Sequence, residues 1–180
     1  MAQARVPANS YSYSKLKYLH YGLGSISKLP ETVKRLGACR RELILTGKSV
    51  SKSPIFEDTS KVLGPAHVTS FTDIGQHTPV AGIKAALEIL KEKDADIIIA
   101  LGGGSPIDAA KAISYYRNQS TGQGFLKIVA IPTTLSAAEY TQNAGYTGED
   151  GHKVAVSDPE LVPDVSQVPR ISGDFITDNV

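Results

Sequence analysis

The residues best suited to chemistry in this sequence are three consecutive glycines followed by a serine and a proline, at positions 102–106. The apolar, β-branched run 95–101 predicts a strand buried on both faces. The residues from Pro106 to Tyr116 predict a helix with Ser105 as its N-cap. Glycines let backbone N–H groups approach a ligand, and the helix start adds free donors and a positive dipole end. We therefore expect a phosphate or pyrophosphate here, the alternative being a tight turn that binds nothing.

This glycine loop, residues 102–105, differs from two common phosphate-binding motifs. It is not G-x-G-x-x-G, because serine and proline follow the third glycine, and no Gly-Lys-Ser or Gly-Lys-Thr comes after it. The triplet Gly-Lys-Ser at 47–49 matches the end of a P-loop, but Glu42 stands where the first glycine is expected. Neither motif by itself therefore assigns a nucleotide site.

Strands and helices alternate around this loop. Strands are predicted at 16–21, 42–46, 68–71, 95–101 and 128–131, and helices at 25–36, 53–64, 78–91 and 106–116. A β-hairpin is predicted at 146–156, with its turn at 148–151. The alternation predicts an α/β fold with a doubly wound, mostly parallel, Rossmann-like sheet.

Doubly wound sheets bind ligands beyond the carboxyl ends of their strands. Three unusual loops are predicted at that edge: 46–48 (Thr-Gly-Lys), 102–105 and 132–134 (Pro-Thr-Thr). Their coincidence on one edge strengthens the prediction of a nucleotide site over the glycine loop alone.

Composition narrows the function classes. The 180 residues are 41% hydrophobic and carry a formal net charge of +1, which fits one globular domain and gives no reason to expect nucleic acid or a membrane as partner. The single cysteine, Cys39, excludes an internal disulfide, and we expect it to be a small buried hydrophobe. No apolar run approaches the ~20 residues of a membrane span, and the first residues lack a signal-peptide core. A cytoplasmic location is the expectation.

Several motifs together resemble one enzyme family. The glycine loop with Asp108 and Lys111, the run 131–134 (Ile-Pro-Thr-Thr) and Glu139 are similar to the iron-containing alcohol dehydrogenases. The spacing in 132–139 is most similar to the maleylacetate reductase branch, and the run 21–26 resembles the family's first strand and turn. The resemblance covers roughly residues 16–163. It leaves 1–15 as a loose N-terminal arm and 164–180 as a polar tail outside the family pattern.

The resemblance implies an NAD(P)-dependent oxidoreductase that transfers hydride between an alcohol and a carbonyl compound. It implies that the glycine loop holds the cofactor pyrophosphate, that Thr133 and Thr134 line the nucleotide, and that Asp108 lies near it. Asp108 could alternatively serve only the helix dipole, and Lys111 could be a surface residue. The candidate cofactor-binding residues are Gly47, Lys48, Gly102, Gly103, Gly104, Ser105, Asp108, Thr133, Thr134 and Leu135.

Two departures from the family pattern affect the cofactor. Gly47 and Lys48 stand where many members carry an aspartate for the ribose hydroxyls, which tilts the expectation from NAD toward NADP. An ordinary turn glycine is the alternative. Ala138 replaces a serine before Glu139, so one polar contact on the nicotinamide side is expected to be lost.

The family's second, helical domain, which carries iron or zinc in full-length relatives, is not expected in a chain that stops at Val180. The four histidines follow no metal-ligand pattern, so we assign no metal ligand and no catalytic residue. The expected function is therefore the nucleotide-binding half of such an oxidoreductase, whose substrate would be a small alcohol, aldehyde or ketoacid. A catalytically inactive nucleotide-binding or interaction module is the alternative. A homodimer is left open.

Overall fold

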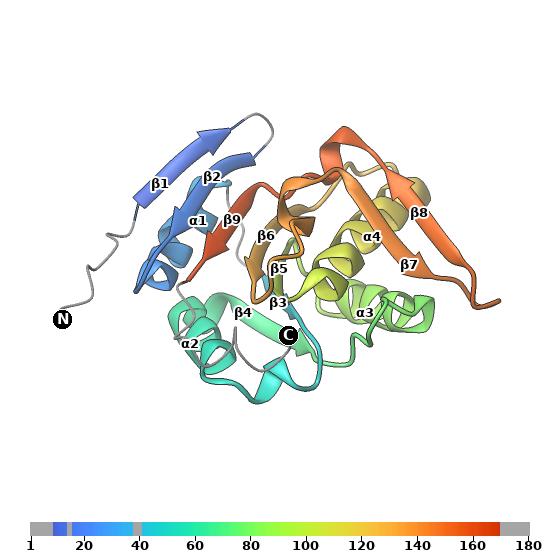
Figure 1. Cartoon of the computed structure of the whole chain (residues 1–180), viewed down its shortest axis with the longest axis horizontal. Coiled ribbons are helices and arrows are strands. Elements are labelled where there is room, and N and C mark those ends of the chain that lie inside the picture. Colours follow the sequence, from blue (N-terminus) through green and yellow to red (C-terminus); the bar gives the residue numbers. More distant parts are fainter. Residues whose placement is uncertain (1–8, 14–15, 38–40, 170–180) are drawn as a thin grey trace.

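The computed structural model describes residues 9–13, 16–37 and 41–169. Its centre is a seven-stranded sheet with the order β1-β2-β9-β6-β5-β3-β4 (Figure 1). The strands are β1 Asn9–Tyr13, β2 Leu16–Tyr21, β3 Glu42–Leu45, β4 His67–Phe71, β5 Ile97–Gly102, β6 Lys127–Pro132 and β9 Val165–Val168. Strand β1 runs antiparallel to β2, and every other neighbouring pair is parallel. The predicted α/β fold with a mostly parallel sheet is confirmed.

Four α-helices cover the two faces of this sheet. They are α1 Leu29–Arg35, α2 Pro54–Leu63, α3 Val80–Glu92 and α4 Gly104–Thr121. Short 3₁₀ turns join them to the strands: η1 Ser25–Lys28, η2 Val50–Lys52, η3 Gly64–Ala66, η4 Ala138–Tyr140 and η5 Pro159–Leu161. Helices α3 and α4 pack on one face, and α1 and α2 pack on the other. The fold is therefore doubly wound, with a separate core on each face.

The buried strand β5 supplies both cores because successive side chains point to opposite faces. Ile98 and Ala100 lie in the core under α3 and α4, whereas Ile97 and Ile99 lie in the core under α1 and α2. All six residues of β5 are buried. An unbroken apolar run is what a parallel strand covered on both faces requires, and the prediction of an interior strand is confirmed.

The predicted hairpin is also present. It consists of β7 Asn143–Thr147 and β8 Lys153–Ser157, which pair antiparallel as a separate two-stranded sheet. Strand β7 packs along α4, so the hairpin lies on the outer side of that helix (Figure 1). The hairpin thus covers α4, the helix that follows the glycine loop.

Part of each predicted end segment pairs in the sheet. Strand β1 lies within 1–15, which we expected to be a loose arm, and it pairs with β2 from Asn9 opposite Tyr21. Strand β9 lies within 164–180, which we expected to be an unrelated tail, and it fills the gap between β2 and β6. The sequence pattern does not predict this strand, because its two central residues, Ser166 and Gln167, are polar. Both are nevertheless fully buried. The expectation for Cys39 lies outside the described residues.

Candidate dinucleotide-binding site

The glycine loop makes the turn from β5 into α4, and its first glycine is needed for steric reasons. Gly102 has φ of 143°, a conformation that residues with a Cβ rarely adopt. A Cβ at this position would lie 2.8 Å from Cγ of Pro106. Glycine therefore lets the chain leave the strand and enter the helix without a clash with the proline ring.

The next two glycines bring the loop against the segment that follows β6. A Cβ on Gly103 would lie 3.1 Å from Oγ1 of Thr134, and a Cβ on Gly104 would lie 3.4 Å from Cβ of Ser136. These distances place the loop after β5 and the loop after β6 side by side. The glycines thus serve the packing of two loops as well as the exposure of backbone donors.

Helix α4 begins two residues earlier than predicted. Its first residue is Gly104 and its N-cap is Gly103, so the prediction of Ser105 as N-cap is wrong. Within the described structure no side chain caps this helix end. Because Pro106 has no N–H, the donors of the first turn come from Gly104 and Ser105. An uncapped start of an 18-residue helix leaves those donors and the positive dipole end available to an anion.

A hydrogen bond joins the threonine loop to the glycine loop directly. The Thr133 N–H donates to the Gly102 carbonyl at 2.9 Å, which extends the parallel pairing of β5 and β6 beyond Gly102 and Pro132. Leu135, the next candidate along the loop, is 95% exposed and lies at the outer rim of the candidate site. Of the predicted loops, these two are therefore in direct contact.

The third predicted loop follows β3, the neighbour of β5 on the other side. A Cβ on Gly47 would lie 3.0 Å from the Ile74 carbonyl oxygen, so the glycine allows the loops after β3 and β4 to approach. Lys48 forms an ion pair of 2.9 Å with Asp73. Sequence analysis missed Asp73, although its place just after β4 matches that of Lys48 after β3.

A buried hydroxyl from the predicted loop 46–48 lies at the end of β3. Thr46 is fully buried at the end of β3, and within the described part of the chain its hydroxyl has no hydrogen-bond partner. Buried polar groups without partners are uncommon, and each needs an explanation. Thr46 lies at the carboxyl edge of the sheet but is enclosed, so we assign it no contact with a ligand.

Two candidate residues on α4 belong to a buried charged network. Lys111, expected as a possible surface residue, is fully buried, and its Nζ donates to the Ala138 carbonyl (2.6 Å) and the Asn143 carbonyl (2.9 Å). Burial lowers the pKa of Lys111 to about 8, against the opposing effect of Asp108 and Glu139. Nζ also lies 4.0 Å from Asp108 Oδ1. Lys111 therefore ties α4 to the segment between β6 and β7.

Asp108 faces the hairpin rather than open solvent. Its Oδ2 accepts a hydrogen bond from the Gly145 N–H at 3.2 Å, and its side chain is 25% exposed. Burial raises the pKa of Asp108, while the bond from Gly145 and the charge of Lys111 act in the opposite direction. Glu139 is also buried, and burial raises its pKa as well. A contact between Asp108 and a cofactor stays a prediction.

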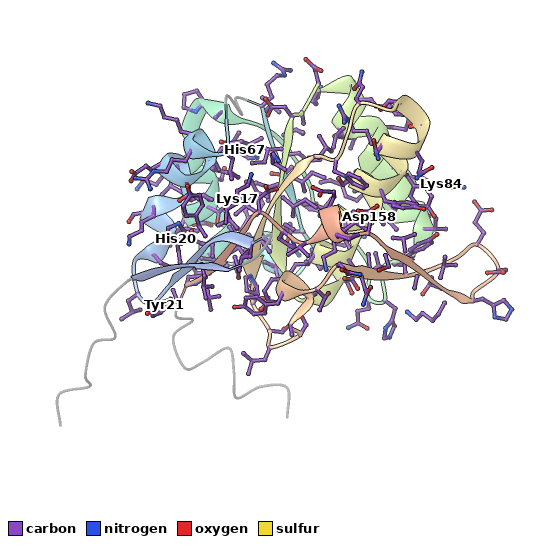
Figure 2. The ribbon with its side chains drawn as sticks, turned by 90° about the horizontal axis from the view of Figure 1, so that it is seen from above. Lys17, His20, Tyr21, His67, Lys84 and Asp158 are labelled. Atoms are coloured by element: carbon purple, nitrogen blue, oxygen red, sulfur yellow. The ribbon has the colours of Figure 1, made fainter. Side chains whose placement is uncertain are left out.

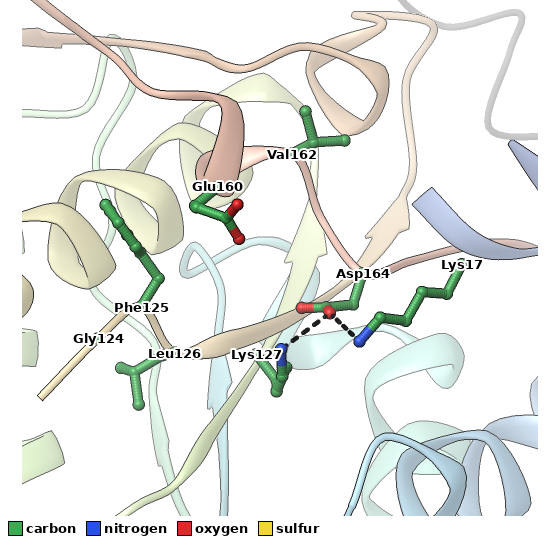
Figure 3. A pocket seen from close by; sticks show the side chains of 8 residues that line it. All are labelled: Lys17, Gly124, Phe125, Leu126, Lys127, Glu160, Val162 and Asp164. Atoms are coloured by element: carbon green, nitrogen blue, oxygen red, sulfur yellow. Dashed lines mark ion pairs between the residues drawn. The ribbon is translucent and has the colours of Figure 1, made fainter. Parts of the chain in front are cut away.

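The described structure also contains a cavity away from these loops. It has a volume of about 600 Å³ and lies at the amino ends of the strands, where Lys17 and Lys127 both pair with Asp164 (Figure 3). Because the glycine loop lies at the opposite, carboxyl edge of the sheet, this cavity is not part of the candidate site.

Metal ligands do not gather in the part of the chain that the structure describes. Among those residues no group of three or more His, Cys, Asp or Glu side chains could hold a metal ion. His20 lies on β2 and His67 on β4, which four other strands separate in the sheet; both residues are labelled in Figure 2. In the same described residues, no helix is both long and apolar enough to cross a membrane.

Known proteins match this chain over most of its length. The family model for iron-containing alcohol dehydrogenase matches residues 17–168. The chain is 33% identical over 143 residues to maleylacetate reductase 2 of Cupriavidus pinatubonensis, which covers 79% of this chain and 37% of that protein. It is 32% identical over 145 residues to a maleylacetate reductase of a Rhizobium species, covering 81% and 38%. The chain thus spans less than half the length of these relatives.

Solved structures agree with this match. The maleylacetate reductase of Agrobacterium tumefaciens has a TM-score of 0.72 at 28% identity, covering 94% of this chain and 43% of that one. The sulfoacetaldehyde reductase of Bifidobacterium kashiwanohense, solved with NAD⁺, has a TM-score of 0.76 at 24% identity, covering 88% and 46%. The second likeness shows the fold alone. The sequence match over residues 17–168 and the shared sheet lead to one conclusion: the chain belongs to the iron-containing alcohol dehydrogenase family.

Proposed function

We propose that this chain binds NAD or NADP at the carboxyl edge of its sheet. The observation that carries the proposal is the contact between the glycine loop and the threonine loop beside an uncapped helix start. Backbone donors there suit a pyrophosphate, because each N–H can bond a phosphate oxygen and the helix dipole favours negative charge. Family membership supports the same assignment.

The residues present fit a dinucleotide along this edge. Gly103, Gly104 and Ser105 would hold the pyrophosphate, since a larger side chain at either glycine would crowd the threonine loop. Thr133, Thr134 and the exposed Leu135 would line the nicotinamide side, with Asp108 behind them on α4. Gly47 and Lys48 would meet the adenosine ribose, since both lie in the loop after β3, the neighbour of β5. When bound, the nicotinamide supplies or accepts a hydride.

Lys48 and Asp73 would act in opposite directions on the choice of cofactor. The Lys48 ammonium attracts the 2′-phosphate of NADP, which is the preference that the sequence indicates. The Asp73 carboxylate, 2.9 Å from that ammonium, repels the same phosphate and can accept a hydrogen bond from a ribose hydroxyl of NAD. The net preference is therefore set by this exposed pair.

The oxidoreductase activity would be hydride transfer between the cofactor and a small alcohol, aldehyde or ketoacid. The named relatives are reductases, and this chain matches fewer than half of their residues. The described residues offer no cluster that fits iron or zinc, so we assign no step to a metal. Nucleotide binding without turnover, as a binding or interaction module, is the second candidate. We further propose a cytoplasmic location and leave a homodimer open.

Titration of the purified 180-residue chain tests both candidates. Enhancement of NADH or NADPH fluorescence on binding would support the nucleotide site, and its absence by fluorescence and calorimetry would refute it. We expect slow or no oxidation of NADPH with a panel of aldehydes and ketoacids. Robust turnover would show instead that this chain is a complete catalyst.

A further inference from the structure

The turn between β4 and α3 has an unusual backbone. His77 and Thr78 have φ of 59° and 53°, although neither is a glycine. A positive φ is most unfavourable for a β-branched residue such as threonine, and such residues persist only where their surroundings hold them. Thr78 is 1% exposed, so the strained residue is enclosed by the protein.

Thr78 connects this turn to the start of α4. Its Oγ1 donates to the Ser105 carbonyl at 3.2 Å, across 27 residues of sequence. Its own N–H donates to the Gly75 carbonyl at 3.2 Å, which closes the turn. Because α4 begins without a capping side chain in the described structure, this hydroxyl is a tertiary contact that restrains its first turn.

The hairpin holds the other side of the same turn. The Thr147 N–H donates to the Thr78 carbonyl and the Thr147 hydroxyl donates to the His77 carbonyl, each at 3.0 Å. Lys153 adds a bond of 3.1 Å from Nζ to the Thr147 hydroxyl. The strained turn is thus clamped between the hairpin and the helix that carries the glycine loop.

We propose that Thr78 is a positioning residue for the glycine loop: its hydroxyl fixes Ser105 and so aims the backbone N–H groups of Gly104 and Ser105 at a phosphate. The proposal rests on the proposed nucleotide site. It explains why a residue with a hydroxyl occupies this left-handed position, since a glycine would relieve the strain but remove the hydroxyl. Thr78 itself is too enclosed to touch the ligand.

Two substitutions separate the hydroxyl from the shape of the side chain. Thr78→Val keeps the branched shape and removes the donor, whereas Thr78→Ser keeps the donor. Thr59→Val is the matched control, because Thr59 is also fully buried and its hydroxyl donates to the Ile55 carbonyl within α2. For each full chain we would measure the Kd for NADH and NADPH, and amide hydrogen exchange in residues 104–111.

We expect Thr78→Val to weaken nucleotide binding about 3- to 10-fold, the effect of one lost hydrogen bond, and to speed exchange in the first turns of α4 by a similar factor. Thr78→Ser should restore both values, and Thr59→Val should change neither. Equal changes in Thr78→Val and Thr59→Val, or no change in Thr78→Val, would overturn the proposal.

The two readouts keep the proposals distinguishable. If the unmodified chain bound no nucleotide, the proposed function would fail, while the exchange rates would still decide whether Thr78 restrains α4. Should Thr78→Val not fold, Thr147→Val removes the hydroxyl that holds the same turn from the hairpin side. Faster exchange at the start of α4 in that variant supports the clamp, and unchanged exchange refutes it.

Discussion

The N–H of Thr133 donates to the carbonyl of Gly102 at 2.9 Å, so the two loops that would hold a dinucleotide are joined by the backbone itself. The bond continues the register of β5 and β6 past their last paired residues. A side chain inserted between these loops must therefore displace either the threonine loop or the ligand.

Gly103→Asp tests this arrangement. The new Cβ would lie 3.1 Å from the Thr134 hydroxyl, and the carboxylate would repel a pyrophosphate. We expect nucleotide affinity to fall at least about 30-fold, as crowding and charge act together at about 1–3 kcal/mol each. Calorimetric titration measures the loss. Ser120→Asp, at an exposed position near the end of α4, serves as a control for added charge. Equal affinity of wild type and Gly103→Asp would mean that the phosphate loop is misassigned.

The Lys48–Asp73 pair is predicted to set the choice between cofactors. Lys48→Ala should lower the affinity for NADP relative to NAD, and Asp73→Asn should raise it, each by about 3- to 10-fold for one exposed charge. The measurement is the ratio of the two Kd values at low salt. Lys84, which pairs with Glu149 on the hairpin, gives the control Lys84→Ala. A ratio that moves in the same direction in both variants would contradict this assignment.

Lys111 should make stability depend on pH in the alkaline range. Its pKa is about 8 in the folded chain and 10.5 ordinarily, so between these values the unfolded chain binds more protons and the contribution of Lys111 to folding rises with pH. Lys111→Met leaves its carbonyl acceptors unpaired and should cost about 2–3 kcal/mol. Urea unfolding from pH 7 to 10.5 should show the wild-type advantage growing. A constant difference would show that Lys111 does not titrate there.

Glu42 should also make stability depend on pH, but with the opposite sign to Lys111. It is 3% exposed at the start of β3, and burial, with a smaller effect of Asp96, raises its pKa from 4.5 to about 7. The folded chain then binds more protons between these values, so stability from this group falls as pH rises. Glu42→Gln should be more stable than wild type by about 1–3 kcal/mol at pH 8 and nearly equal at pH 4.5. The reverse order at pH 8 would mean that the carboxylate is stabilised by a partner.

The sequence predicts the repeating part of the fold and misses what depends on distant contacts. The apolar run of β5 and the turn residues of the hairpin carry their structure locally, which is why both predictions hold. Strand β9 was missed because Ser166 and Gln167 are buried only through pairing with β2 and β6. No local pattern could reveal that strand.

For the candidate site as for the fold, the sequence predicts the parts that depend on local pattern and misses those that depend on distant contacts. The glycine and threonine loops follow from strand ends in a parallel sheet, so the sequence was sufficient to place them. Thr78 and Lys111 could not be found in this way. Both residues form hydrogen bonds with the hairpin, which lies 30 or more residues further along the chain, so no local pattern marks them.

The position of β9 also orders the events of folding. Strand β2 (Leu16–Tyr21) joins the rest of the sheet only through β9 (Val165–Val168), so the first and last strands of the parallel sheet become neighbours late. During synthesis, β3 to β6 can assemble while the paired strands β1 and β2 stay apart from them until residues 165–168 have left the ribosome. Such long-range closure slows folding and exposes an open strand edge to other chains in the meantime. The yield of folded protein should therefore depend on how quickly β9 pairs with β2 and β6.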